Sequence, residues 1–115
     1  MSRDDGATLL DLFRAARFVI KFRGGVDKSA FLNDPKTQSA ILHQLLIIGE
    51  AAKRLSESFR ASHPHIPWKK ITGMRDKLIH DYDEADIEEV WNTVAVDVPT
   101  LITLLEPLIP QANQR

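Results

Sequence analysis

Cysteine is absent from the 115 residues. This absence excludes disulfides, thiolate zinc sites, iron–sulfur clusters and a thiol nucleophile, and it is typical of a reducing, cytoplasmic setting. Long apolar runs are also missing. Charged residues interrupt the first part of the chain, so no signal peptide is expected, and no run approaches the roughly 20 residues of a membrane helix. We therefore expect a cytoplasmic protein that does not associate with a membrane.

Net charge is also small, because 15 Lys and Arg stand against 16 Asp and Glu, a net charge of -1. A protein that simply coats nucleic acid is excluded, and any RNA contact must be local. Residues 52–80 nevertheless hold seven basic and two acidic residues, whereas residues 81–106 hold eight acidic residues and no Lys or Arg. The two blocks indicate either a phosphate-binding surface beside an acidic protein-binding surface, or ordinary solvated helix faces.

Apolar residues recur at helical spacing in the first half of the chain, and no segment alternates with the period of a strand. This spacing predicts helices over 8–22 and 28–32. A long helix is expected from Pro35, with Asp34 as its N-cap, through Phe59 to just before the loop that begins at His63.

The second half predicts shorter helices. Pro67 opens a helical turn, Thr72 and Gly73 interrupt it, and a helix follows over about 74–80. Asp86 caps the last helix, and Pro99 should kink it.

These elements make one all-α domain over residues 1–115. We expect a bundle of four or five helices with a core over about 8–106 and a fraying tail at 107–115. Trp68 and Trp91 stand beside apolar stripe residues, which favours core positions over base stacking.

The residues that carry chemistry gather in one run, RDKLIHDY, at 75–82. Asp76 and His80 share a helix face, so the carboxylate can orient the imidazole and stabilise its protonated form. Arg75 can reach the same space, where a guanidinium stabilises phosphate charge and an imidazole transfers a proton near neutral pH. The same spacing also describes a partly exposed histidine beside a salt-bridged arginine, so spacing alone does not establish catalysis.

No carboxylates or histidines are spaced for a nuclease metal site. His63 and His65 stand in a loop with two prolines and without an obvious third ligand, which is typical of solvated histidines. We expect no metal and no cofactor, and a surface or interface position for His43.

Three runs, at 47–56, 63–71 and 73–82, closely resemble the HepT-like proteins, the toxin members of the HEPN superfamily. The later residues 90–91 and 97–101 also look like that family, so the resemblance covers roughly Leu9 to Leu105. It implies a dimeric HEPN-type bundle and a metal-independent endoribonuclease. It also implies a toxin of a type II-like (type VII) toxin–antitoxin system, whose partner is a nucleotidyltransferase-fold antitoxin.

The family motif of Arg, four residues, His, one residue and Tyr falls on Arg75, His80 and Tyr82. The resemblance implies that Arg75 and His80 cleave RNA and that the antitoxin adenylylates Tyr82, the only tyrosine of the chain. Asp76 fills a variable polar position and has a supporting role. Glu50 either faces the Arg75 cleft and orients it or is an ordinary boundary residue.

A dimer has a chemical reason in this interpretation, because two copies of His80 supply both a general acid and a general base. The alternative is a non-catalytic helical partner that binds a nucleotidyltransferase. In that case Arg75 and His80 hold nucleotide phosphate or the interface.

Overall fold

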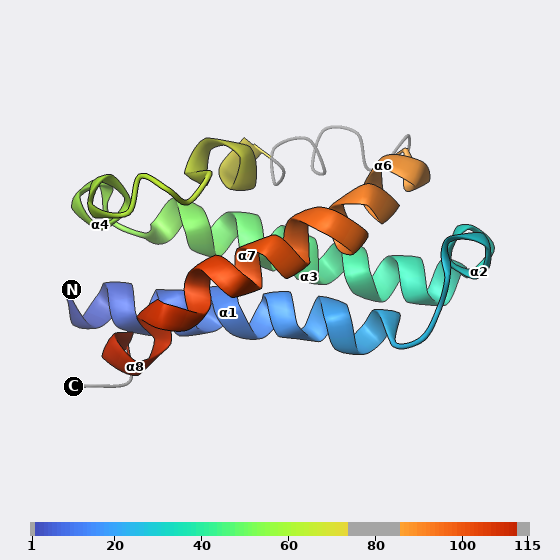
Figure 1. Ribbon diagram of the computed structural model, residues 1–115, viewed down its shortest axis with the longest axis horizontal. Helices are drawn as coiled ribbons and strands as arrows, with labels where there is room; N and C mark the ends of the chain where they lie inside the picture. The colour runs from blue at the N-terminus through green and yellow to red at the C-terminus, as the bar shows by residue number, and fades with distance from the viewer. Residues whose placement is uncertain (1, 74–85, 113–115) are drawn as a thin grey trace.

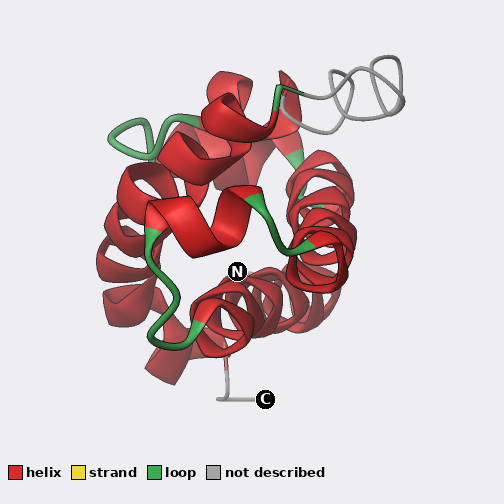
Figure 2. Ribbon diagram, turned by 90° about the vertical axis from the view of Figure 1, so that its right-hand side faces the viewer, coloured by secondary structure: helices red, strands yellow, loops and turns green. Residues whose placement is uncertain are grey.

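The computed structural model describes residues 2–73 and 86–112, and in these ranges every regular element is a helix (Figures 1 and 2). The elements are α1 (Arg3–Arg23), α2 (Lys28–Leu32), α3 (Pro35–Arg54), α4 (Glu57–Ser62), helical residues 68–73, α6 (Ile87–Asn92), the π-helix η2 (Thr93–Asp97), α7 (Val98–Leu105), the 3-10 helix η3 (Glu106–Leu108) and α8 (Ile109–Ala112). The antiparallel α1 and α3 form the base, and α7 packs on α1 (Figure 1). The predicted all-α class is confirmed.

Side-chain caps set where several helices begin. The Ala30 N–H donates to Asp27 Oδ1 at 2.9 Å, and the Thr37 N–H donates to Asp34 Oδ1 at 3.2 Å. Asp34 therefore caps α3 with Pro35 in the first turn, as predicted, and α2 has the predicted bounds. These side chains satisfy backbone donors that have no partner inside the helix.

One apolar cluster joins the elements. α1 buries Leu9, Leu12 and Val19, and α3 buries residues at helical spacing that include Ile41, Leu45 and Ile48. The tryptophans predicted for the core are confirmed there, since Trp68 and Trp91 are each 9% exposed.

The start of α1 differs from the prediction. The helix begins at Arg3, not at Thr8, because the Asp5 N–H donates to Ser2 Oγ at 3.0 Å and so caps an earlier turn. Few apolar residues mark this turn, so the spacing of apolar residues misses it. Gly24, with φ of 55°, ends the helix where the sequence predicted an end.

The single long helix predicted through Phe59 is wrong, because α3 ends at Arg54 and α4 begins at Glu57. The Ser56 N–H donates to Asp5 Oδ1 at 2.9 Å, so it is not used in a helical bond, and the Ser56 hydroxyl donates to Asp5 Oδ2 at 2.7 Å. The Ser56 Oγ also accepts the Phe59 N–H at 3.1 Å and caps α4. Phe59 remains buried, so the apolar stripe continues across a break in the backbone.

One prediction for the second half also needs correction. Residues 72–73 do not interrupt the helix, since 68–73 are continuously helical, and the helix predicted at 74–80 lies outside the described residues. Just before Pro99 the helix widens into the π-helix η2, in which the Val98 N–H donates to the Thr93 carbonyl, and the kink expected at Pro99 stays a prediction. Pro99 has no N–H to give to the preceding turn, and a π-turn is a known way to accommodate such a gap.

The prediction that the chain frays from residue 107 is wrong for residues 107–112, which are helical. Leu108 is 8% exposed and Ala112 is 1% exposed, and α8 packs against α1 (Figure 1). Burial of these side chains outweighs the helix-breaking tendency that two prolines indicate in the sequence. The last three residues, 113–115, lie outside the described residues.

Candidate functional site

The predicted site residues Arg75, Asp76, His80 and Tyr82 all lie outside the described residues 2–73 and 86–112. Their roles therefore stay predictions. The structure does describe the elements that precede and follow them in the chain, and these elements determine how the motif is held at its two ends.

The upstream end, residues 68–73, is anchored by an aromatic cluster. The Trp68 indole N–H donates to the His63 carbonyl at 3.0 Å, and the Phe59 ring lies 6.1 Å from the Trp68 ring between centroids. Ile71 is 4% exposed. Pro67 precedes the helix, where its fixed backbone angle suits a first turn. The chain therefore enters the motif from a helix whose inner face is packed.

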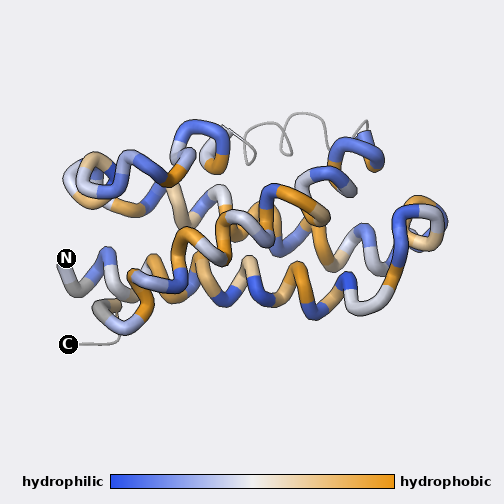
Figure 3. The backbone as a smooth tube through the Cα atoms, in the orientation of Figure 1, coloured by the Kyte–Doolittle hydropathy of each residue, from blue (hydrophilic) through white to orange (hydrophobic). Residues whose placement is uncertain are grey.

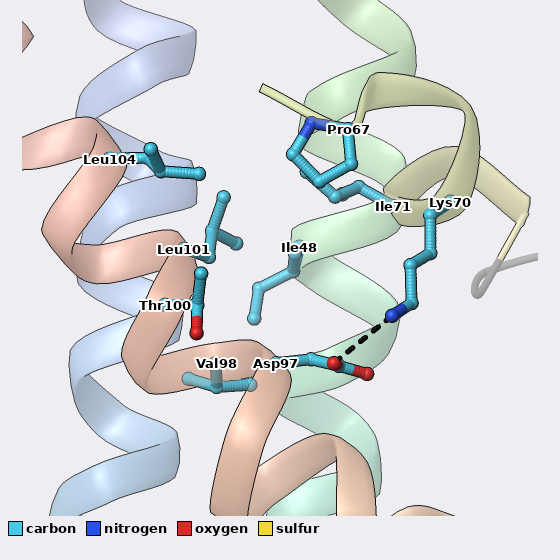
Figure 4. A pocket seen from close by; sticks show the side chains of 9 residues that line it. All are labelled: Ile48, Pro67, Lys70, Ile71, Asp97, Val98, Thr100, Leu101 and Leu104. Atoms are coloured by element: carbon cyan, nitrogen blue, oxygen red, sulfur yellow. Dashed lines mark hydrogen bonds and ion pairs between the residues drawn. The ribbon is translucent and has the colours of Figure 1, made fainter. Parts of the chain in front are cut away.

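An ion pair joins the same helix to the neighbouring η2. Lys70 Nζ donates to Asp97 Oδ1 at 3.1 Å. Figure 4 shows this pair at the edge of a small cavity of about 110 Å³, whose apolar walls include Ile48, Ile71 and Leu101. Because the Lys70 side chain is 63% exposed, the pair adds little to stability. It links residues 68–73 directly to η2.

The downstream end begins with α6, which Asp86 caps as predicted. Asp86 Oδ1 accepts the N–H groups of Glu88 and Glu89 at 3.0 and 3.3 Å. Trp91 then packs on Phe31, with ring centroids 5.4 Å apart, and the Arg23 guanidinium carbon lies 4.6 Å from the centre of the Trp91 ring. A cation over an indole face is attracted to it. The chain therefore leaves the motif into a helix held by both α1 and α2.

Glu50 is partly buried on α3. Its predicted partner Arg75 is not among the described residues, so the choice between an orienting carboxylate and a boundary residue stays open. His43 is exposed, as predicted. In the described ranges no three His, Asp or Glu side chains are grouped so that they could hold a metal ion.

A family model described as ribonuclease HepT-like matches residues 12–108 of this chain. The chain belongs to the HepT-like ribonuclease family. The family predicted from the sequence runs is thereby confirmed, and the match spans the HepT-like motif at 75–82.

Individual relatives agree with the HepT-like assignment. A Thermococcus cleftensis protein named "Probable ribonuclease HepT" is 40% identical over 108 residues, which cover 94% of this chain and 98% of that protein. A Methanocaldococcus jannaschii protein named "Putative RNase MJ0125" is 34% identical over 113 residues, covering 98% of this chain and 97% of that protein. No solved structure gives a significant match.

Sequence reasoning missed the Lys70–Asp97 pair, because its members stand 27 positions apart in the HepT-like chain and lie in two separate runs, 63–71 and 97–101, whose spacing does not link them. Only the opposite signs of the basic and acidic blocks point to it. Within the described part of the chain, no helix is both long enough and apolar enough to cross a membrane.

Proposed function

We propose that this HepT-like protein is a metal-independent endoribonuclease and the toxin of a toxin–antitoxin pair. The observation that carries the proposal is the family match over residues 12–108, which spans the motif residues Arg75, His80 and Tyr82. Ribonuclease names on relatives that align along nearly their full length support the same assignment.

The proposed reaction needs no metal, because RNA carries its own nucleophile. The 2′-OH attacks the adjacent phosphorus, the bond from phosphorus to the 5′-oxygen breaks, and the products are a 2′,3′-cyclic phosphate and a free 5′-OH. One group removes the proton of the 2′-OH, another protonates the leaving 5′-oxygen, and a cation stabilises the phosphorane. His80 takes a proton-transfer role, and Arg75 supplies the cation with a forked set of donors that matches phosphate oxygens.

A homodimer completes this set of groups. One chain brings a single His80, whereas the reaction needs a base and an acid at once. A symmetric pair brings two copies of the same residue to one interface. We propose that the second His80 fills the remaining role, with Asp76 and Glu50 as supporting residues.

The antitoxin in this proposal is a nucleotidyltransferase that transfers AMP from ATP to the Tyr82 hydroxyl and releases pyrophosphate. The adduct adds a bulky anion near Arg75 and His80 in the sequence. It therefore excludes the substrate phosphate by charge and by volume.

RNA cleavage in EDTA tests the ribonuclease proposal. We expect the wild type to cut RNA, and Arg75→Ala and His80→Ala to lose at least about a hundredfold in rate, the usual effect of removing such a group. Lys36→Ala, at an exposed position on α3, is the control and should keep wild-type activity. Circular dichroism establishes that each variant is folded. Equal cleavage by the wild type and both motif variants would contradict the proposal and favour the non-catalytic partner.

Intact mass tests the modification. After incubation with the transferase and ATP, the wild type should gain the mass of one AMP group, and Tyr82→Phe should gain none. An adduct that persists in Tyr82→Phe would show that the modified residue is a different one.

A further inference from the structure

One face of α1 carries exposed cations at helical spacing. Arg14, Arg17 and Lys21 are all exposed and lie three and four residues apart, so they share one side of the helix. Within residues 2–73 and 86–112, Arg17 and Lys21 have no carboxylate partner, and the nearest carboxylate to Arg14 is that of Asp11 at 3.9 Å. We call these three residues the α1 basic face.

Aromatic rings border the α1 basic face. Phe18 and Phe22 are 40% and 37% exposed, and their rings are stacked, with centroids 5.4 Å apart and an angle of 19° between planes. In Figure 3, hydrophilic and hydrophobic stretches alternate along α1. Exposed rings beside exposed cations form a surface suited to a ligand with both charged and planar groups.

A groove runs along this side of the bundle. Residues of α1 line it on one side, and Pro99 and Ile102 of the segment around α7 line it on the other. Its volume of about 1050 Å³ lies just above the roughly 300–1,000 Å³ typical of small-molecule sites, which favours a chain-like ligand. Each charged residue that lines the groove is basic: the three residues of the α1 basic face and, beyond them, Arg23.

The charges select among possible occupants. A second copy docked symmetrically through the same groove would set Arg14, Arg17 and Lys21 of one protomer against the same residues of its partner. Like charges in one interface are unfavourable, so this face favours an anionic occupant. Arg14 and Lys21, the two ends of the α1 basic face, are seven positions apart, which is about 10 Å along the helix axis. At a rise of about 3.4 Å per nucleotide of one strand, this length corresponds to about three nucleotides.

We propose that the α1 basic face and the Phe18–Phe22 pair bind single-stranded RNA, with phosphates on the cations and a base on the exposed ring. The proposal rests on the proposed ribonuclease function for its choice of RNA over an acidic protein. The proposed function assigns the chemistry to Arg75 and His80, and we assign the α1 basic face to binding of the substrate strand. Its loss should raise KM and leave kcat unchanged.

Fluorescence anisotropy with a labelled, unstructured 12-nucleotide RNA in EDTA tests the proposal on the His80→Ala background, in which the RNA stays intact. Removal of two phosphate contacts by Arg17→Gln/Lys21→Gln should lower the slope of log affinity against log salt by about 1.4. Between 50 and 200 mM salt, the parent should then lose about sevenfold more affinity than the double variant. Phe18→Leu keeps an apolar side chain but removes the ring, and should weaken binding about fivefold.

The matched control is Lys28→Gln/Lys36→Gln, which removes the same charge from other exposed positions and should keep the parent's salt slope. Unchanged RNA affinity and slope in Arg17→Gln/Lys21→Gln would overturn the proposal, and loss of antitoxin binding in that variant would then identify a protein-binding face. The test is separate from that of the ribonuclease proposal. RNA bound through α1 but left uncut by the wild type would contradict the nuclease assignment alone.

Discussion

At the scale of single residues, Asp5 shows how a buried carboxylate can be held charged. Burial raises the pKa of the Asp5 carboxyl, but hydrogen bonds from the Ser56 N–H and hydroxyl and from Ser2 outweigh burial, so the pKa is lowered overall. The pKa of Asp34 is lowered too, chiefly by hydrogen bonds from the Thr37 hydroxyl and N–H. In both cases the folded protein binds the proton less readily than the unfolded chain.

A lowered pKa makes folding sensitive to acid. The contribution of Asp5 to stability is complete above its unfolded pKa of about 3.9 and is lost as pH falls through its lower folded value. Asp5→Asn should reduce the free energy of unfolding by about 2 kcal/mol at neutral pH, because charged hydrogen bonds to Ser56 become neutral ones. The difference between wild type and variant should narrow below about pH 4.

Urea unfolding at neutral and acidic pH measures this difference. Asp4→Asn, at an exposed position in the same turn, is the control and should cost less than about 1 kcal/mol. If the difference in the free energy of unfolding between wild type and Asp5→Asn stayed constant down to pH 2, the charge of the Asp5 carboxylate would not be what strengthens its hydrogen bonds with Ser56.

Local chemistry could be predicted from the residues, and distant partners could not. Asp34 and Asp86 are recognisable as caps because the groups they accept lie two or three positions away. The contact between Asp5 and Ser56 joins residues 51 positions apart, and nothing in the spacing of either residue marks it. The α1 basic face has a helical spacing that is visible in the sequence, but near-neutral composition over the first half of the chain conceals it.

At the scale of elements, the spacing of apolar residues is a better guide to which residues are buried than to where a helix ends. Phe59 is buried as its place in the helical spacing predicts, although the helix ends before it. The break at Ser56 depends on an N–H group whose acceptor, Asp5, lies far away in the sequence, which is a property of the folded chain. The final turn, η3 with α8, forms because α1 offers it an apolar surface.

The Lys70–Asp97 pair links η2 to residues 68–73, which directly precede the predicted Arg75 site, so we expect it to help position that site. Asp97→Asn should leave thermal stability within about 1 kcal/mol of wild type. It should lower kcat about tenfold, because a small displacement of catalytic groups costs rate even where stability is kept.

The direction of the change in cleavage rate distinguishes a positioning role of Asp97 from a purely electrostatic one. Removal of an acidic group makes the protein more attractive to RNA, so a purely electrostatic role for Asp97 predicts faster cleavage at low substrate. A slower reaction with unchanged KM supports positioning. Glu106→Gln, an exposed acid of the same block, is the control for net charge and should leave kcat unchanged.

At the scale of the whole molecule, the sequence composition and the order of its motifs establish the all-α class and the HepT-like family. Contacts between residues far apart in the chain require the folded structure. A helical bundle and a HepT-like family could be predicted because both depend on patterns repeated along the chain. The meeting of the basic and acidic blocks at Lys70 and Asp97 required the fold. The catalytic roles of Arg75 and His80 remain predictions from the motif.

The proposed division of acid and base between two copies of His80 makes activity a property of the dimer. Cleavage per chain should then fall on dilution, with a midpoint at the dissociation constant of the dimer, because a lone protomer has one proton-transfer group where the reaction needs two. Initial rates in EDTA over a dilution series measure activity, and sedimentation under the same conditions measures mass. Rates strictly proportional to protein concentration across the change from dimer to monomer would show that one chain holds the complete site. In that case the second group must come from another residue of the same protomer, and Asp76, one position from Arg75, is the first to test.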